Sequence, residues 1–327
     1  MSSSHALRTP LCDLLGCQYP VIQTAMGWVA GSSLVAATTN AGGFGFLAGA
    51  TIPADEVEAE IIRVKELTGN KPFGLNFHMF QTNANQLLDL AIEHKIRAVS
   101  YGRGPDKKVI GRLRDAGIVC MPTVGALKHA QQAIEMGANA ITVQGGEGGG
   151  HTGTVATMAL VPQVVDAVGD KMVVVAAGGL FDGRGLAASL ALGADGVWIG
   201  TRFIATHEAR GVDGYKEKLI DTLEDGTVIT RSYTGKTCRV VRNDWTNKFE
   251  EHPETLQGFP QQAIASMQAG VNHLGYPEGT KVDVEQEFMP AGQGVGAIKS
   301  IVHAGDLVRS MMAEAEHSLD RIQAMRK

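Results

Sequence analysis

The residues AITVQGGEGGGHTG, at positions 140–153, decide how the rest of the chain is interpreted. The apolar run 140–143 predicts a buried strand, and the glycine-rich segment Gln144–Gly153 begins where that strand ends. Glycine has no Cβ, so this backbone can adopt positive φ and approach a ligand closely. The segment carries one imidazole, on His151. A solvated glycine linker is the alternative, but linkers have polar flanks and these flanks are apolar. We therefore expect a functional loop at a strand end.

The same strand pattern recurs along the first two thirds of the chain. Most of the β-rich runs follow a glycine that can end a helix, as at Gly42, Gly117, Gly137 and Gly193. The runs are apolar on both faces, which is typical of a parallel sheet covered by helices. Repeated βα units of this kind predict an α/β fold, a (β/α)8 TIM barrel. The predicted strands are Val21–Ala25, Phe44–Ala48, Phe73–Phe77, Ala98–Tyr101, Val119–Val124, Ala140–Gln144, Val173–Gly178 and Gly196–Gly200.

The βα rhythm stops near Thr206. Residues 206–289 are richer in charge and in Trp, Tyr and Thr, which indicates an insertion or lid over one barrel face. Helical periodicity returns in the tail, through Val295, Ile298, Leu307 and Met311, and we expect this tail to pack against the barrel. The predicted organisation is a barrel formed by 1–205 with 290–327, and a lid formed by 206–289.

Composition excludes several classes of protein. The 327 residues are 44% hydrophobic and carry a net charge of -5, without a basic stripe that would follow nucleic acid. The N-terminal residues lack a signal-peptide core, and no apolar run is long enough for a membrane. The four cysteines have neither CxxC nor metal-ligand spacing. We expect a cytoplasmic protein without a metal site; the sequence leaves a homodimer open.

Two glycine turns predict a phosphate site. In a (β/α)8 barrel, phosphate commonly binds in the loops after strands seven and eight. Here those strands end in Gly178-Gly179-Leu180 and in Gly200-Thr201. Exposed backbone N–H groups at such turns are suitable donors to phosphate. Tight turns without a ligand are the alternative.

Other predicted strand ends carry groups suited to a flat ring. Gln23–Trp28 offers small residues and backbone groups, and Asn76 places an amide at the same rim. An amide both donates and accepts hydrogen bonds, which suits the pyrimidine edge of a flavin. Asn76 on its own is equally explained as a turn residue.

His151 is the candidate catalytic residue. An imidazole can act as a general base towards a carbon acid, or as a donor to a developing oxyanion. A helix-capping histidine is the alternative. Glu147 is expected to orient His151 or the loop. His78, His94 and His129 lack a comparable loop and are interpreted as structural or surface residues.

Taken together, these motifs resemble the FMN-dependent nitronate monooxygenases, formerly called 2-nitropropane dioxygenases. Bacterial FMN-type enoyl-acyl-carrier-protein reductases and a flavin NADH:quinone reductase are similar. The resemblance implies a catalytic role for His151. It also implies FMN contacts from Ala25, Met26, Gly27, Asn76, Gln144, Gly150, Gly178, Gly179, Leu180, Gly200 and Thr201.

The chain departs from the family pattern in two places. Thr123 stands where some members have a flavin-contacting lysine, and Gly148-Gly149 replaces a pair that usually contains another small residue. This loop, with the motif GWVAG at 27–31, looks most like a branch that acts as acyl-CoA dehydrogenase on steroid-ring fragments.

Three functions therefore remain open, all with a small-molecule substrate. The first is an FMN oxidoreductase that oxidises a nitronate, with dioxygen as acceptor. The second is an FMN-dependent acyl-CoA dehydrogenase or enoyl-thioester reductase, with CoA phosphates held by basic residues. The third is a non-redox phosphate-binding barrel, such as an isomerase or a ligand sensor. The basic candidates are Arg202, Arg231, Arg239 and Arg242.

Overall fold

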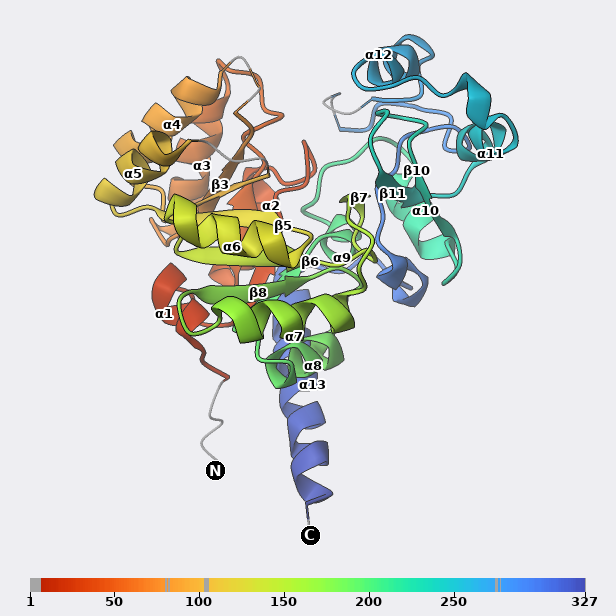
Figure 1. Cartoon of the computed structure of the whole chain (residues 1–327). Coiled ribbons are helices and arrows are strands. Elements are labelled where there is room, and N and C mark those ends of the chain that lie inside the picture. The colour runs from red at the N-terminus through yellow and green to blue at the C-terminus, as the bar shows by residue number, and fades with distance from the viewer. Residues whose placement is uncertain are drawn as a thin grey trace.

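The computed structural model of the chain describes residues 7–79, 81, 83–102, 106–273, 276 and 278–326. Its centre is a closed barrel of eight parallel strands, as predicted (Figure 1). Pairing of Val21 with Val197 closes the ring between the first and last strands. The barrel strands are β1 (Val21–Gln23), β2 (Phe44–Leu47), β3 (Gly74–Phe77), β4 (Ala98–Tyr101), β5 (Val119–Val124), β6 (Ala140–Gln144), β8 (Val173–Ala177) and β9 (Gly196–Ile199).

Helices alternate with these strands and cover the outside of the barrel. The glycines expected to end helices have left-handed φ values, for example 75° at Gly117 and 92° at Gly137. Asp182 caps the helix after β8, as predicted, by accepting a hydrogen bond from the backbone N–H of Gly185 at 3.1 Å. The barrel-side helices are α1 (Pro10–Leu15), α2 (Ser32–Asn40), α3 (Val57–Thr68), α4 (Ala84–Glu93), α5 (Lys107–Asp115), α6 (Leu127–Met136), α7 (Thr157–Val168), α8 (Gly183–Ala191) and α9 (Thr201–Ile204).

Large apolar side chains fill the barrel interior. Phe44, Phe46, Met121 and Trp198 are buried there. The rings of Phe46 and Trp198 lie 4.6 Å apart between centroids. Strand β1 ends at Gln23, two residues earlier than predicted, and Thr24 and the residues after it line the cavity at the barrel's rim. The interior is therefore a solid core, and ligands have access only to the strand ends.

The segment after β9 forms its own layer beside the barrel (Figure 1). It contains α10 (Tyr215–Asp221), β10 (Thr227–Thr230), β11 (Cys238–Val241), α11 (Asp244–Glu251), η1 (Pro253–Thr255) and α12 (Gln261–Gln268). We refer to residues 206–289 as the lid. A short strand, β7 (Gly150–His151), joins it as the third strand of an antiparallel sheet, β10-β11-β7.

Strand β7 differs from the sequence prediction, which treated all of Gln144–Gly153 as loop. Cys238 pairs with His151 and Arg239 pairs with Gly150. A two-residue strand has no alternation to detect, and its partner lies far along the chain. Local pattern therefore could not reveal it.

The tail packs back on the barrel as expected, but its helix starts later than the periodicity from Val295 indicated. Residues Gln293–Ala297 form a short 3-10 helix, η2, and α13 spans Ala304–Ala324. Glycines at 292, 294 and 296 disfavour an α-helix there. Helix α13 packs against α8 and α2. Among the helices that the structure describes, none is both long and apolar enough to cross a bilayer.

Helices α8 and α13 pack closely because residue 183 is a glycine and has no side chain. A Cβ on Gly183 would lie 2.2 Å from the carbonyl oxygen of Met311, on the backbone of α13. Gly183→Ala should therefore lower the free energy of unfolding by about 1–3 kcal/mol. Gly111→Ala is the matched control, because nothing lies within 4 Å of that helical position, and it should raise stability by about 0.5–1 kcal/mol. Urea unfolding measures both; equal midpoints would contradict this packing.

Candidate active site

A cavity of about 430 Å³ lies at the carboxyl ends of the barrel strands, under the lid. Its volume is in the range of small-molecule and cofactor sites. Every residue predicted from sequence to bind the cofactor or to act in catalysis lines this one cavity. These are Ala25, Met26, Gly27, Asn76, Gln144, Gly150, His151, Gly178, Gly179, Leu180, Gly200 and Thr201.

One end of the cavity is suited to an anion. Gly178 and Gly179 have φ values of 102° and 71°, and a Cβ on Gly178 would lie 2.8 Å from Oγ1 of Thr157. Within the described residues, the backbone N–H groups of Gly179 and Leu180 have no hydrogen-bond acceptor. Thr201 accepts a hydrogen bond from the backbone N–H of Gly292 at 2.9 Å, so its own hydroxyl proton is left for a ligand. These donors fit a phosphate group.

The amide of Asn76 is oriented at another part of the rim. Its Nδ2 donates to the carbonyl oxygen and to Oγ of Ser100, at 3.1 and 3.2 Å. Both amide protons are thereby used, and Oδ1 is left to accept a hydrogen bond from a ligand. Met26 and Gly27 lie on the same cavity wall. The arrangement fits a flat heterocycle that presents an N–H group to Oδ1.

The glycine loop is anchored on two sides. Glu147 accepts from the backbone N–H of Thr157 at 3.0 and 2.9 Å and from its hydroxyl at 2.9 Å. Of the two roles considered for Glu147, the contacts show that it orients the loop. From the lid, Nε of Arg239 donates to the carbonyl oxygen of Gly146 at 3.0 Å. A Cβ on Gly149 would meet the Ala291 backbone at 2.7 Å, so no other residue fits there without a shift.

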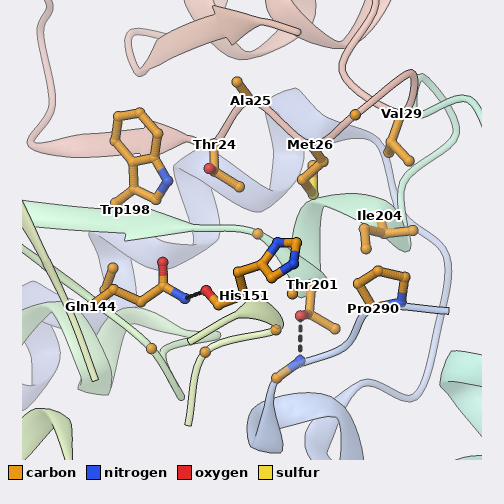
Figure 2. Close-up of a pocket in the computed structure, with 18 of the residues that line it drawn as sticks. Thr24, Ala25, Met26, Val29, Gln144, His151, Trp198, Thr201, Ile204 and Pro290 are labelled. Atoms are coloured by element: carbon orange, nitrogen blue, oxygen red, sulfur yellow. Dashed lines mark hydrogen bonds between the residues drawn. The ribbon is translucent and has the colours of Figure 1, made fainter. Parts of the chain in front are cut away.

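The imidazole of His151 projects into the cavity among Met26, Thr201 and Ile204 (Figure 2). Its backbone carbonyl accepts from Nε2 of Gln144 at 3.1 Å. Its Nε2 lies 3.2 Å from Oγ1 of the lid residue Thr234. His151 belongs to strand β7 and caps no helix, so the capping alternative is excluded.

The surroundings of His151 keep its imidazole neutral. Partial desolvation lowers its pKa, and the positive charge of Lys236 and the neighbouring His78 lower it further. A neutral imidazole at physiological pH can accept a proton. The side chain stays exposed to the open cavity, so a substrate can reach it.

His78 was interpreted as structural or surface, but it lines the same cavity. Its pKa is also lowered, first by burial and then by Lys236. The residue directly follows the carboxyl end of β3. Its position after a barrel strand was the sequence signal that could have identified it.

The lid supplies cavity residues that no sequence motif indicated. Together with residues after β1 and β9, they make one wall that is predominantly apolar. The hydroxyl proton of Tyr215 is already used, because it is donated to the carbonyl oxygen of Pro290 at 2.6 Å. The wall consists of Trp28, Val29, Ile204, Tyr215, Thr234, Cys238, Phe288 and Pro290.

All four arginines proposed for CoA phosphates make polar contacts within the chain, and they differ in how exposed they are. Arg239 is 7% exposed and bonded within the loop and lid, so that prediction is wrong. Arg202 donates to the carbonyl oxygens of Ala205 and Ser300. Arg242 forms an ion pair with Glu250. Arg231 remains exposed, in the same turn as Lys236.

The chain is an oxidoreductase with a closed parallel barrel and a cavity at its strand ends. The chain belongs to the nitronate monooxygenase family, whose model matches residues 8–91 and 81–314. Enzymes of this family are flavin enzymes in general. This membership confirms the resemblance inferred from the sequence motifs.

Relatives with different reactions share this fold. The chain is 49% identical to the (3aS,4S,5R,7aS)-5-hydroxy-7a-methyl-1-oxo-octahydro-1H-indene-4-carboxyl-CoA dehydrogenase of Mycobacterium tuberculosis, over 75% of this chain and 69% of the relative. FabK from Thermotoga maritima superimposes with a TM-score of 0.88 at 31% identity, over 97% and 99% of the two chains. Nitroalkane oxidase from Streptomyces ansochromogenes gives a TM-score of 0.81 at 31% identity, over 95% and 99%.

Lys236 should control both cavity histidines. In the native protein the ammonium of Lys236 lies 3.7 Å from the centroid of the Phe259 ring. Lys236→Met removes this positive charge and keeps an apolar side chain near the ring. The pKa values of His151 and His78 should both rise, because the charge lowers them in the native protein. NMR titration of the imidazole Cε1 resonances measures this. Lys248→Met, in α11 of the lid, is the control and should leave both titrations unchanged. An unaltered His151 titration in Lys236→Met would contradict the assignment.

Proposed function

We propose that this protein is an FMN-dependent dehydrogenase of an acyl-CoA thioester whose acyl group is a bulky alicyclic ring system. The observation that carries the proposal is the apolar part of the cavity lining, which the lid forms together with residues after β1 and β9. Aromatic and aliphatic side chains there, including Trp28, Ile204 and Phe288, can bury a fused hydrocarbon ring. A small nitronate needs no such surface.

Sequence similarity supports the same substrate class. The relative at 49% identity is named for an acyl-CoA with an indene ring skeleton, whereas the nitroalkane oxidase is 31% identical. The exposed Arg231 and the half-buried Lys236, both in the turn between β10 and β11, are the lid cations that we assign to CoA phosphates. Residues 206–289 act in this proposal as the substrate-side lid of an FMN-binding barrel.

The cavity residues fit FMN. The turns at Gly178–Leu180 and Gly200–Thr201 line the same cavity and would together hold one phosphate group, the number that a mononucleotide carries. Asn76 Oδ1 is placed to accept from the pyrimidine N–H of the flavin. Thr123 also lines the cavity, so this wall carries no positive charge at that position. Bound FMN would accept the hydride and later pass its electrons to dioxygen or another acceptor.

The residues of the chain supply the proton chemistry. In the proposed reaction His151 takes the proton from the α-carbon of the thioester, and a carbon–carbon double bond forms as the β-carbon gives up the hydride that bound FMN would accept. A neutral imidazole is required for this step, and the lowered pKa of His151 provides it.

A substrate panel tests the proposal. The purified protein should be yellow and should release FMN on denaturation. Under anaerobic conditions, alicyclic acyl-CoA thioesters should bleach the flavin absorbance, whereas propyl-2-nitronate should bleach it slowly or not at all. Bleaching by the nitronate alone would establish the nitronate reaction instead. A colourless protein that cannot be reconstituted with FMN would overturn both flavin reactions.

His151→Gln tests the base. The variant should retain FMN, because it leaves the residues that are predicted to contact the cofactor unchanged. Its kcat should fall by about 10²–10⁴-fold, because the base is lost. In the native enzyme the acidic limb of the rate profile should lie below the ordinary histidine pKa, because the pKa of His151 is lowered. His129→Gln, on helix α6, is the control and should keep native turnover. Native turnover in His151→Gln would show that another group takes the proton.

A further inference from the structure

Thr234 is the lid residue that contacts the imidazole of His151. It lies in the turn between β10 and β11, and it is 9% exposed. The turn is held in place by hydrogen bonds on both sides of Thr234. Oγ of Ser266 donates to the carbonyl oxygen of Tyr233 at 2.8 Å, and Nε of Arg231 donates to that of Gly235 at 3.0 Å. The hydroxyl of Thr234 therefore has a fixed position relative to strand β7.

Three groups meet at Oγ1 of Thr234, each at 3.2 Å. The backbone N–H of Lys236 donates to it, the hydroxyl itself donates to the carbonyl oxygen of Lys236, and Nε2 of His151 is the third group. A hydroxyl has one proton and two lone pairs. If its proton goes to the Lys236 carbonyl, all three contacts are satisfied only when Nε2 of His151 is itself a donor.

We infer that Thr234 is a positioning residue that holds His151 in the tautomer protonated on Nε2, so that Nδ1 is the atom that accepts the substrate proton. No catalytic contact is assigned to Thr234 itself. The role in turnover rests on the proposed function, whereas the tautomer is a property of the free protein.

The same hydrogen bond stabilises the product of proton transfer. An imidazolium donates from both nitrogens, and its Nε2–H donates more strongly than that of the neutral ring. Thr234 thus opposes the groups that disfavour the charged ring, which are Lys236 on the same turn and His78 after β3. Cys238, opposite His151 on β11, is a neutral thiol because burial raises its pKa to about 12.

The test compares three variants. Thr234→Val keeps the shape of the side chain and removes the hydroxyl, Thr234→Ser keeps the hydroxyl, and Thr237→Val changes an exposed threonine in the same connection. Two-bond ¹H–¹⁵N correlation spectra of histidine-labelled enzyme report which ring nitrogen carries the proton. The His151 signals, among those of ten histidines, are assigned by their loss in His151→Gln.

In the native protein, Thr234→Ser and Thr237→Val, His151 should be protonated on Nε2. In Thr234→Val this preference should weaken, the pKa of His151 should fall further, and kcat with the acyl-CoA should drop about tenfold with little change in KM. A native ring protonated on Nδ1 would overturn the inference, as would Thr234→Val with native tautomer and pH profile. If the tautomer result holds but acyl-CoA fails to reduce the flavin, the proposed function is wrong and the positioning role stands.

Discussion

Pairing of Cys238 with His151, and of Arg239 with Gly150, joins the lid to the glycine loop of the barrel. These two backbone registers place the imidazole at the strand ends, because β7 consists of only Gly150 and His151. The Arg239 guanidinium reinforces them by binding the Gly146 carbonyl from the lid side. A loop this rich in glycine has high conformational entropy when free. The lid therefore both covers the cavity and orders the segment that carries the base.

The barrel was predictable because its signals are local. Each βα unit shows an apolar run, a helix and often a helix-ending glycine, and a short window of sequence contains all three. The position of the turns at Gly178 and Gly200, in one cavity at the strand ends, was predictable for a related reason. The fold places the ends of strands seven and eight at one known position, so residue type alone was sufficient.

The lid's part of the site was not predictable. Thr234, Tyr215 and Phe288 reach the cavity through contacts that are distant in sequence, and nothing in their own neighbourhoods indicates a site. Arg239 is the opposite case, a residue that the sequence suggested for ligand binding and that has a structural role instead. An arginine in a lid suggests an anion ligand, yet this one is buried and holds the loop. Only the tertiary arrangement distinguishes a positioning cation from a binding one.

A crystal structure of the yellow, flavin-bound protein tests the central claim most directly, namely that one cavity brings the phosphate cradle and the lid-held imidazole to the same flavin. We expect density for the FMN phosphate at Gly179 and Thr201, for the pyrimidine edge at Asn76, and for the imidazole of His151 facing the ring with Nε2 on Thr234. A flavin bound with its phosphate elsewhere, or an imidazole turned away from the ring, would contradict it.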